Sequence, residues 1–332
     1  MRASAITDAA RVSVVIPTWN AGPLFERVLA ALAAQDVEGG LELVVIDSGS
    51  SDGTAELAAA AGAYVFRIPQ AEFNHGTARN RAIARTRGAI VCLLTQDAVP
   101  QGAGYVRSLV APFDDAGVDG AYARQVPRPD CDPLLAERLR RWMAARTERE
   151  LHALAPGDPA AARARFDVLP PMERYLASAF DNVASALRRS TWERHPFPAR
   201  SFGEDVAWAR EVLLDGGRIA FEPAAVVEHS HRIRMLREAR RIYCDHRNLA
   251  ELFGLRNVPT PGAVLRGWGW QQRFYGQLLA GQNLPIQRRC YWRAYSIPYA
   301  LLETAAQYLG ARSLAREGAL WAWADARIRR GI

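Results

Sequence analysis

Four short apolar runs, each followed by a polar or helical stretch, occupy the first hundred residues and constrain the fold more than any other feature. They are VSVVI at 12–16, LELVVI at 41–46, YVFRI at 64–68 and AIVCLL at 89–94. A helix is predicted at 76–87, closed by Gly88. Apolar strands that alternate with helices are typical of βαβ units on a parallel sheet. The sequence therefore predicts an α/β fold with a mostly parallel central sheet flanked by helices.

The chain of 332 residues is long enough for two domains. We expect one over 1–230, within which the charged, proline-containing residues 123–170 are interpreted as an insertion or acceptor-side lobe. In the same domain FGEDVAWAREVLLDGG predicts a helix, and RIAFEP and AVVEH predict two short strands. Residues 231–332 are expected to form a helical, aromatic-rich C-terminal extension, which is basic because it holds 17 arginines against six acidic residues.

The composition excludes several classes of function. All 42 basic residues are arginines, which excludes a Schiff-base lysine, a P-loop lysine and a pyridoxal-phosphate anchor. No GxGxxG follows the first run, which counts against a dinucleotide oxidoreductase. The four cysteines lie far apart, which argues against a zinc site and a disulfide framework. Because neither a signal peptide nor a membrane span is predicted, we expect a cytoplasmic protein.

Small polar loops follow three of the predicted strands, namely TWN at 18–20, DSGSSDGT at 47–54 and TQDA at 95–98. In open α/β sheets ligands bind beyond the carboxyl ends of the strands, where these loops lie. The pattern indicates a nucleotide-binding half-fold with its site at this edge.

Five fragments in order, VSVVIPTWN, VVIDSGSSDGT, FNHGTARNRA, LLTQDAVP and FGEDVAW, resemble the inverting family-two glycosyltransferases. FNHG, ARN and TQDA resemble the bacterial rhamnosyltransferase-like branch. The resemblance covers about two thirds of the chain and implies a GT-A fold, which is Rossmann-like. It also implies transfer of a sugar from a nucleoside-diphosphate donor, with dTDP-rhamnose favoured, to a hydroxyl with inversion. The implied acceptor is a glycan or a polyprenyl-diphosphate-linked molecule.

A departing diphosphate needs a divalent cation or arginine donors, so Mg²⁺ or Mn²⁺ is expected. The resemblance assigns the metal carboxylate to Asp97. The family's usual pair of aspartates reads Thr95-Gln96-Asp97 here, so the first carboxylate is missing and Gln96 is an alternative contact for metal-bound water or sugar. Alternation places His229 and His231 on one face. His229 is expected to complete the metal site, and the diphosphate is assigned to His231 and Arg232.

The resemblance also assigns the nucleotide and donor contacts. Asp47 and Ser48 stand where the family has two acids that hold the base and ribose, although Asp47 also fits as a turn residue. The other contacts are assigned to Thr18, Asn20, His75, Gly76 and Arg79. Gly76 is explained equally well as a loop glycine with positive φ.

The family places its catalytic base in the ED pair of FGEDVAW, and we assign it to Asp205, with Glu204 orienting acceptor hydroxyls. The alternative is that both carboxylates only favour a helix amino terminus. Asn182 and Trp208 are assigned to the acceptor, with Trp208 open to a role in the core.

The C-terminal extension holds eight aromatic residues and four arginines between 268 and 299. This mixture suits a membrane interface, so peripheral contact with the inner face of the plasma membrane is expected, although such stripes also form helical cores. No nucleic-acid partner is expected, because no helix-turn-helix or RNP pattern occurs.

Two other functions are considered for this fold. A sugar-phosphate nucleotidyltransferase would need a Gly-rich basic loop after the first strand, and TWNAGP has none. The missing carboxylate at Thr95 leaves open a non-catalytic glycan or lipid-carrier binding protein.

Overall fold

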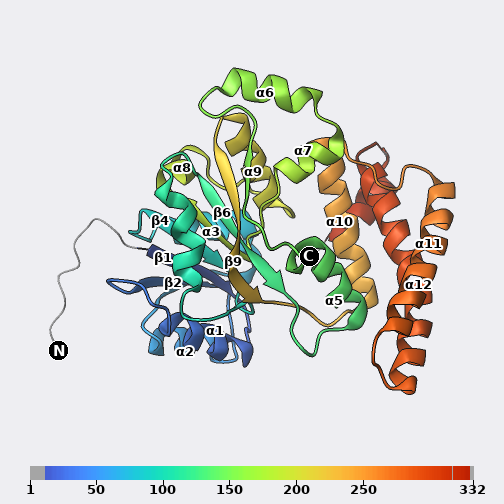
Figure 1. The fold of residues 1–332 in the computed structure, drawn as a ribbon, viewed down its shortest axis with the longest axis horizontal. Coiled ribbons are helices and arrows are strands. Elements are labelled where there is room, and N and C mark those ends of the chain that lie inside the picture. Colours follow the sequence, from blue (N-terminus) through green and yellow to red (C-terminus); the bar gives the residue numbers. More distant parts are fainter. Residues whose placement is uncertain (1–11, 316, 330–332) are drawn as a thin grey trace.

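The computed structural model describes residues 12–315 and 317–329, and a nine-stranded sheet forms its centre (Figure 1). The strand order is β3-β2-β1-β4-β8-β6-β9-β5, and β7 pairs with β9. The strands are β1 (Val12–Thr18), β2 (Leu41–Asp47), β3 (Tyr64–Arg67), β4 (Ile90–Leu94), β5 (Val99–Pro100), β6 (Gly120–Val126), β7 (Glu150–Ala153), β8 (Ala184–Arg188) and β9 (Arg218–Glu228).

Helices cover both faces of this sheet (Figure 1). The helices of the front part are α1 (Leu24–Ala33), α2 (Thr54–Ala60), α3 (His75–Ile83), α4 (Tyr105–Val110), α5 (Pro133–Leu139), α6 (Pro159–Val168), α7 (Pro171–Ala177), α8 (Arg189–Arg194) and α9 (Glu204–Leu214). One apolar core lies under α1 and α4, and the other lies under α3, α6 and α9. The expected α/β architecture, with a mostly parallel first half, is confirmed.

The four predicted strands of the first half are β1 to β4, and they pair with one another in parallel. The helix predicted at 76–87 is shorter than expected, since α3 ends at Ile83. There the Thr86 hydroxyl donates to the Ile83 carbonyl at 2.8 Å, and the Arg189 guanidinium donates to the carbonyls of Ile83 and Gly88. These bonds satisfy the carbonyls that another helical turn would have used.

The second half of the sheet is mixed, because β8 runs antiparallel to both β4 and β6. The prediction of two strands in RIAFEP and AVVEH is wrong, since both belong to the single strand β9. β9 pairs with β6 on either side of a register shift between Ala123 and Arg124. At its carboxyl end β9 pairs with β5, with Glu228 opposite Val99. This pairing brings the residues after β9 next to those after β4.

The C-terminal extension is helical, as predicted, with α10 (Met235–Phe253), α11 (Pro261–Gly281), α12 (Ile286–Arg312) and α13 (Ala319–Arg329). α11 and α12 lie side by side (Figure 1). Leu249 and Phe253 of α10 pack into the same core as the sheet. Within the described residues, no helix has the length and hydropathy needed to span a bilayer.

Most of the aromatic residues of the extension pack inside it. Tyr275, Trp292 and Tyr299 are buried together with Leu134 of α5, while Trp270 and Tyr291 remain more than half exposed. The predicted membrane-facing aromatic belt is therefore mostly an interhelical core, because the aromatic residues of α11 and α12 recur on the sides that face other helices.

Candidate functional site

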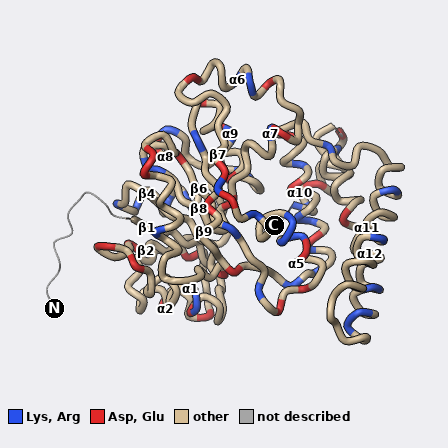
Figure 2. Tube along the Cα trace, viewed as in Figure 1, with Lys and Arg blue, Asp and Glu red and all other residues tan. Residues whose placement is uncertain are grey.

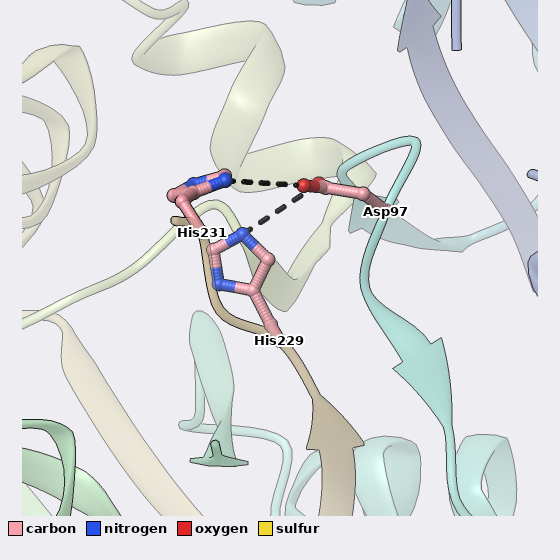
Figure 3. Close-up of side chains that lie close together, drawn as sticks. All are labelled: Asp97, His229 and His231. Atoms are coloured by element: carbon pink, nitrogen blue, oxygen red, sulfur yellow. Dashed lines mark ion pairs between the residues drawn. The ribbon is translucent and has the colours of Figure 1, made fainter. Parts of the chain in front are cut away.

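Three side chains from two loops converge at the carboxyl edge of the sheet (Figure 3). Asp97 follows β4, and His229 and His231 follow β9. Asp97 Oδ1 lies 3.6 Å from His229 Nε2, and Asp97 Oδ2 lies 3.4 Å from His231 Nδ1. The three ligand atoms lie within 4.8 Å of one another. One carboxylate and two imidazoles at this spacing form a candidate metal centre.

His229 is buried and neutral. Burial lowers its pKa to about 4, and His231, Arg128 and Arg241 add to this effect, whereas Asp97 opposes it. Its Nδ1 lies 3.0 Å from Gln125 Oε1. Because that oxygen only accepts, the contact is a hydrogen bond when the ring proton is on Nδ1. In that tautomer the lone pair of Nε2 faces the Asp97 carboxylate.

Two arginines that sequence reasoning missed surround this cluster. Arg128, after β6, donates to the backbone carbonyl of Asp97 at 3.3 Å and to that of Ser230, so it ties the two loops together. Arg241, on α10, lies near enough to lower the pKa of His229. Arg232 is exposed and makes no hydrogen bond or ion pair within the described part of the chain. The signal for Arg241 was its place in the arginine-rich start of the extension.

A second group of carboxylates lies at the amino end of α9. Asp205 is partly exposed, and its Oδ1 and Oδ2 accept from the backbone N–H groups of Val206 and Asn182 at 2.9 and 3.3 Å. Burial, followed by the charges of Glu204 and Asp181, raises the pKa of Asp205 to about 8. A pKa in this range is compatible with proton transfer near neutral pH, and the catalytic role of Asp205 stays a prediction.

Glu204 points the other way, into the protein. It forms a buried ion pair with Arg79 of α3 and lies 3.4 Å from Asn182 Nδ2. Direct contact of Glu204 and Asn182 with an acceptor, and of Arg79 with the nucleotide, is therefore not supported by their positions. Asn182 donates its backbone N–H to Asp205, while the charge of Glu204 raises the pKa of Asp205 and that of Arg79 lowers it.

A continuous chain of contacts joins the Asp97 cluster to the residues around Asp205. Asp181 precedes Asn182, and its Oδ2 accepts from Gln125 Nε2 at 2.5 Å, so contacts run from Asp97 through His229 and Gln125 to the residues that hold Asp205. Sequence reasoning missed Gln125 and Asp181, which lie in no recognised motif.

The loops after β1 and β2 bind each other. Asp47 is fully buried, and its carboxylate accepts from the hydroxyls of Thr18 and Ser50 and from the N–H groups of Gly49 and Ser50 at 2.5 to 3.2 Å. The Ser48 hydroxyl donates to the Thr18 carbonyl at 3.0 Å. These bonds make Asp47 a loop-building residue, and its contact with a base stays a prediction.

Asn20 and Gln96 hold the same edge. Asn20 has a φ of +43°, and its side chain accepts from Ser51 N at 2.9 Å. Gln96 binds both the N–H and the carbonyl of Trp19, at 2.8 and 3.2 Å. The Trp19 side chain is half exposed, a feature that its place in TWN directly after a strand could have signalled.

Two assignments need correction. Trp208 is fully buried against Phe180 and Phe197, and its Nε1 donates to the His195 carbonyl, so it is a core residue and not an acceptor contact. Gly76 lies in the first turn of α3 without a positive φ. A Cβ there would come within 2.2 Å of the Pro198 carbonyl oxygen, so close packing explains this glycine. His75 beside it is exposed at the helix terminus.

Comparisons with known proteins show which family this chain is similar to. The model of the family described as Glycosyl transferase family 2 matches residues 13–169. The chain is 30% identical to the O-antigen chain rhamnosyltransferase RfbN of Salmonella typhimurium, over 90% of this chain and 88% of the relative. It is 27% identical to the O-antigen chain rhamnosyltransferase WbaN of Salmonella anatum, over 90% and 87%.

A solved structure of glucosyl-3-phosphoglycerate synthase from Mycobacterium tuberculosis, in complex with Mn²⁺, UDP-glucose and phosphoglyceric acid, has the same fold. It aligns with a TM-score of 0.52 at 23% identity, covering 76% of this chain and 82% of that one. With the relatives above, the sheet and its carboxyl-edge site lead to one conclusion. The chain belongs to glycosyl transferase family 2 and is a glycosyltransferase with the GT-A fold.

Proposed function

We propose that this glycosyltransferase moves rhamnose from dTDP-rhamnose to a hydroxyl of a glycan or polyprenyl-diphosphate-linked acceptor, with inversion at the anomeric carbon. The single observation that carries the proposal is the network that joins Asp97 and His229 to Asp205. It links the candidate cation centre to the candidate proton acceptor, which supports the two roles that a single displacement of a diphosphate requires. The names of the two O-antigen relatives favour rhamnose and a surface-glycan acceptor.

The residues around Asp97 fit a divalent cation. Asp97 and His229 direct a carboxylate oxygen and a nitrogen lone pair at each other, and a cation between them would turn this repulsion into attraction. His231 offers a third ligand. Because the set includes imidazole, Mn²⁺ suits it better than Mg²⁺, which prefers oxygen. The bound ion would supply positive charge for the leaving diphosphate.

Asp205 would act on the opposite face of the sugar. The acceptor oxygen forms a bond to the anomeric carbon, the bond from that carbon to the diphosphate breaks, and the hydroxyl proton passes to the Asp205 carboxylate. The pKa of about 8 makes Asp205 a better base than an ordinary aspartate. The charge of Arg241, which lowers the pKa of His229, supports a role for this residue in neutralising part of the diphosphate charge.

The donor base would bind at the loops after β1 and β2. The half-exposed Trp19 offers a ring for stacking, and Gln96 fixes its backbone. The two loops are joined by hydrogen bonds from the Thr18 hydroxyl to Asp47 and from the Ser48 hydroxyl to the Thr18 carbonyl, which fix the conformation of this edge.

Contact with a membrane is part of the proposal because a lipid-linked acceptor lies at one. Residues 261–312 hold six arginines and one acidic residue, the buried Glu303 (Figure 2). Ile286, Ile297 and Leu301 recur at helical spacing on the exposed side of α12. A basic face with exposed apolar residues suits anionic headgroups.

Sedimentation with vesicles that contain phosphatidylglycerol, but not with pure phosphatidylcholine, is expected. Ile297→Asp should reduce it, and equal sedimentation with both vesicles would remove this part.

The transfer itself is tested with purified protein. Donor nucleotide sugars are screened for protection against thermal unfolding with and without Mn²⁺, and the product linkage is then determined by NMR. We expect dTDP-rhamnose with Mn²⁺ to protect most, and the product to have the inverted configuration. Asp205→Asn should keep the protection and lose transfer. If no nucleotide sugar protects, or if the configuration is retained, the proposal is wrong.

A further inference from the structure

We propose that Asp181 and Gln125 are positioning residues that fix the ring tautomer of His229 and hold it in register with Asp205. This inference rests on the proposed function, because it gives His229 the role of a metal ligand. Gln125 is buried, and neither residue is proposed to contact the substrate. Each acts through the hydrogen bonds that it makes to the groups that do.

The hydrogen-bond chain that leads to His229 begins at Asp181, which accepts a hydrogen bond on each carboxylate oxygen. Oδ1 accepts from the backbone N–H of Val183 at 2.9 Å, and Oδ2 accepts from Gln125 Nε2 at 2.5 Å. Only a carboxylate can accept a hydrogen bond on each of its two terminal atoms in this position. An asparagine at position 181 would turn its NH₂ group toward one of the two donors. Asp181 therefore forces Gln125 to turn its amide nitrogen toward it.

The orientation of Gln125 then decides the state of His229. With its nitrogen on Asp181, Gln125 presents Oε1 to His229 Nδ1 at 3.0 Å. Gln125 is buried on β6, and β6 pairs with β9 with Gln125 opposite Val227, so the amide has little freedom to turn. The ring proton is held on Nδ1, which leaves Nε2 as the ligand atom that faces Asp97.

The same short loop holds the proposed base. Asn182, the residue after Asp181, donates its backbone N–H to Asp205 Oδ2 at 3.3 Å. Two consecutive residues therefore set the position of His229 through Gln125 and the position of Asp205 directly. This arrangement fixes the separation of the cation centre and the base without any contact between the two.

The tautomer can be measured without metal, nucleotide or activity. Imidazole ¹⁵N NMR of the metal-free protein distinguishes Nδ1–H from Nε2–H, and His229→Gln identifies the signal. Burial raises the pKa of Asp181, while its bonds from Val183 and Gln125 lower it, so the spectrum is recorded at alkaline pH where the carboxylate is ionised. We expect Nδ1–H in the wild type, and an increased share of Nε2–H in Asp181→Asn.

Mn²⁺ affinity supplies the second readout. Asp181→Asn and Gln125→Leu should each weaken Mn²⁺ binding by about 10- to 100-fold. Gln271→Leu is the matched control, because Gln271 of α11 also donates its amide nitrogen to a buried carboxylate, that of Glu303 at 3.2 Å, and lies in the C-terminal extension. It should lower stability and leave Mn²⁺ affinity unchanged.

Two results would overturn the inference. One is a wild-type His229 with its proton on Nε2, a measurement that does not depend on the folding of any variant. The other is unchanged Mn²⁺ affinity in a folded Asp181→Asn or Gln125→Leu protein. A protein with the expected tautomer and affinities that transfers no sugar would instead refute the proposed function and leave this inference standing.

Discussion

Asp47 and Asp97 both follow strands of the same sheet, yet their carboxylates have opposite surroundings. Asp47 is fully buried and accepts hydrogen bonds from two hydroxyls and two backbone N–H groups. Within the residues that the structure describes, no hydrogen bond is donated to the Asp97 carboxylate. It faces two imidazoles instead.

The contrast distinguishes a carboxylate that stabilises the fold, Asp47, from one that is available to bind a ligand, Asp97. A buried carboxylate with a full set of donors stabilises its loop and has little capacity left for a ligand. A partly exposed carboxylate that faces the lone pair of a neutral histidine keeps its oxygens available for a cation. Both positions fit a nucleotide site by sequence, and only the hydrogen-bond partners tell them apart.

Removing the Asp97 charge tests the comparison where the effect should be largest. Asp97→Asn should reduce transfer by about a thousandfold or more, equal to about 4 kcal/mol of transition-state stabilisation. The measurement is kcat/KM for sugar transfer at saturating Mn²⁺. Because no described donor depends on the carboxylate, the unfolding midpoint should hardly change. Activity within a few-fold of wild type would contradict the role of Asp97.

Asp205 is intermediate between the two cases, since it accepts two backbone bonds but lies beside Glu204 and Asp181. Its pKa of about 8 predicts that kcat/KM rises with pH and levels off above that value, as the carboxylate ionises.

The same shift has a consequence for stability. A carboxyl whose pKa is raised on folding lowers the stability of the folded state as pH rises from the pKa of the unfolded chain toward about 8. Above pH 8, Asp205→Asn should therefore be more stable than wild type by on the order of 2 kcal/mol. In acid, where the carboxyl is protonated in both states, this gain should become smaller. Urea unfolding at both pH values checks this, and a destabilised Asp205→Asn in alkali would contradict it.

Asp47 should show the smallest effect on the chemical step. Asp47→Asn gives the Thr18 and Ser50 donors a poorer acceptor, so the free energy of unfolding should fall by roughly 1–3 kcal/mol. The Mn²⁺ affinity should stay close to that of wild type. A large loss of Mn²⁺ affinity with unchanged stability would reverse the proposed distinction between Asp47 and Asp97.

The sequence was sufficient for features that lie in one continuous segment. The alternation of strands and helices predicted the parallel half of the sheet, and the position of TQDA after a strand predicted where Asp97 lies. Gln125 escaped prediction because it meets His229 only through the pairing of β6 with β9, 104 residues apart. Trp208 was misassigned because helical spacing does not say which face packs on Phe180 and Phe197.

The central claim is that Asp97 and His229 share one cation. Pulsed electron paramagnetic resonance of the Mn²⁺-loaded protein measures it most directly, because a nitrogen ligand couples to the electron spin. We predict an imidazole nitrogen coupling in the wild type that is lost or strongly reduced in His229→Gln. A Mn²⁺ spectrum without nitrogen coupling, or one that His229→Gln leaves unchanged, would contradict the claim.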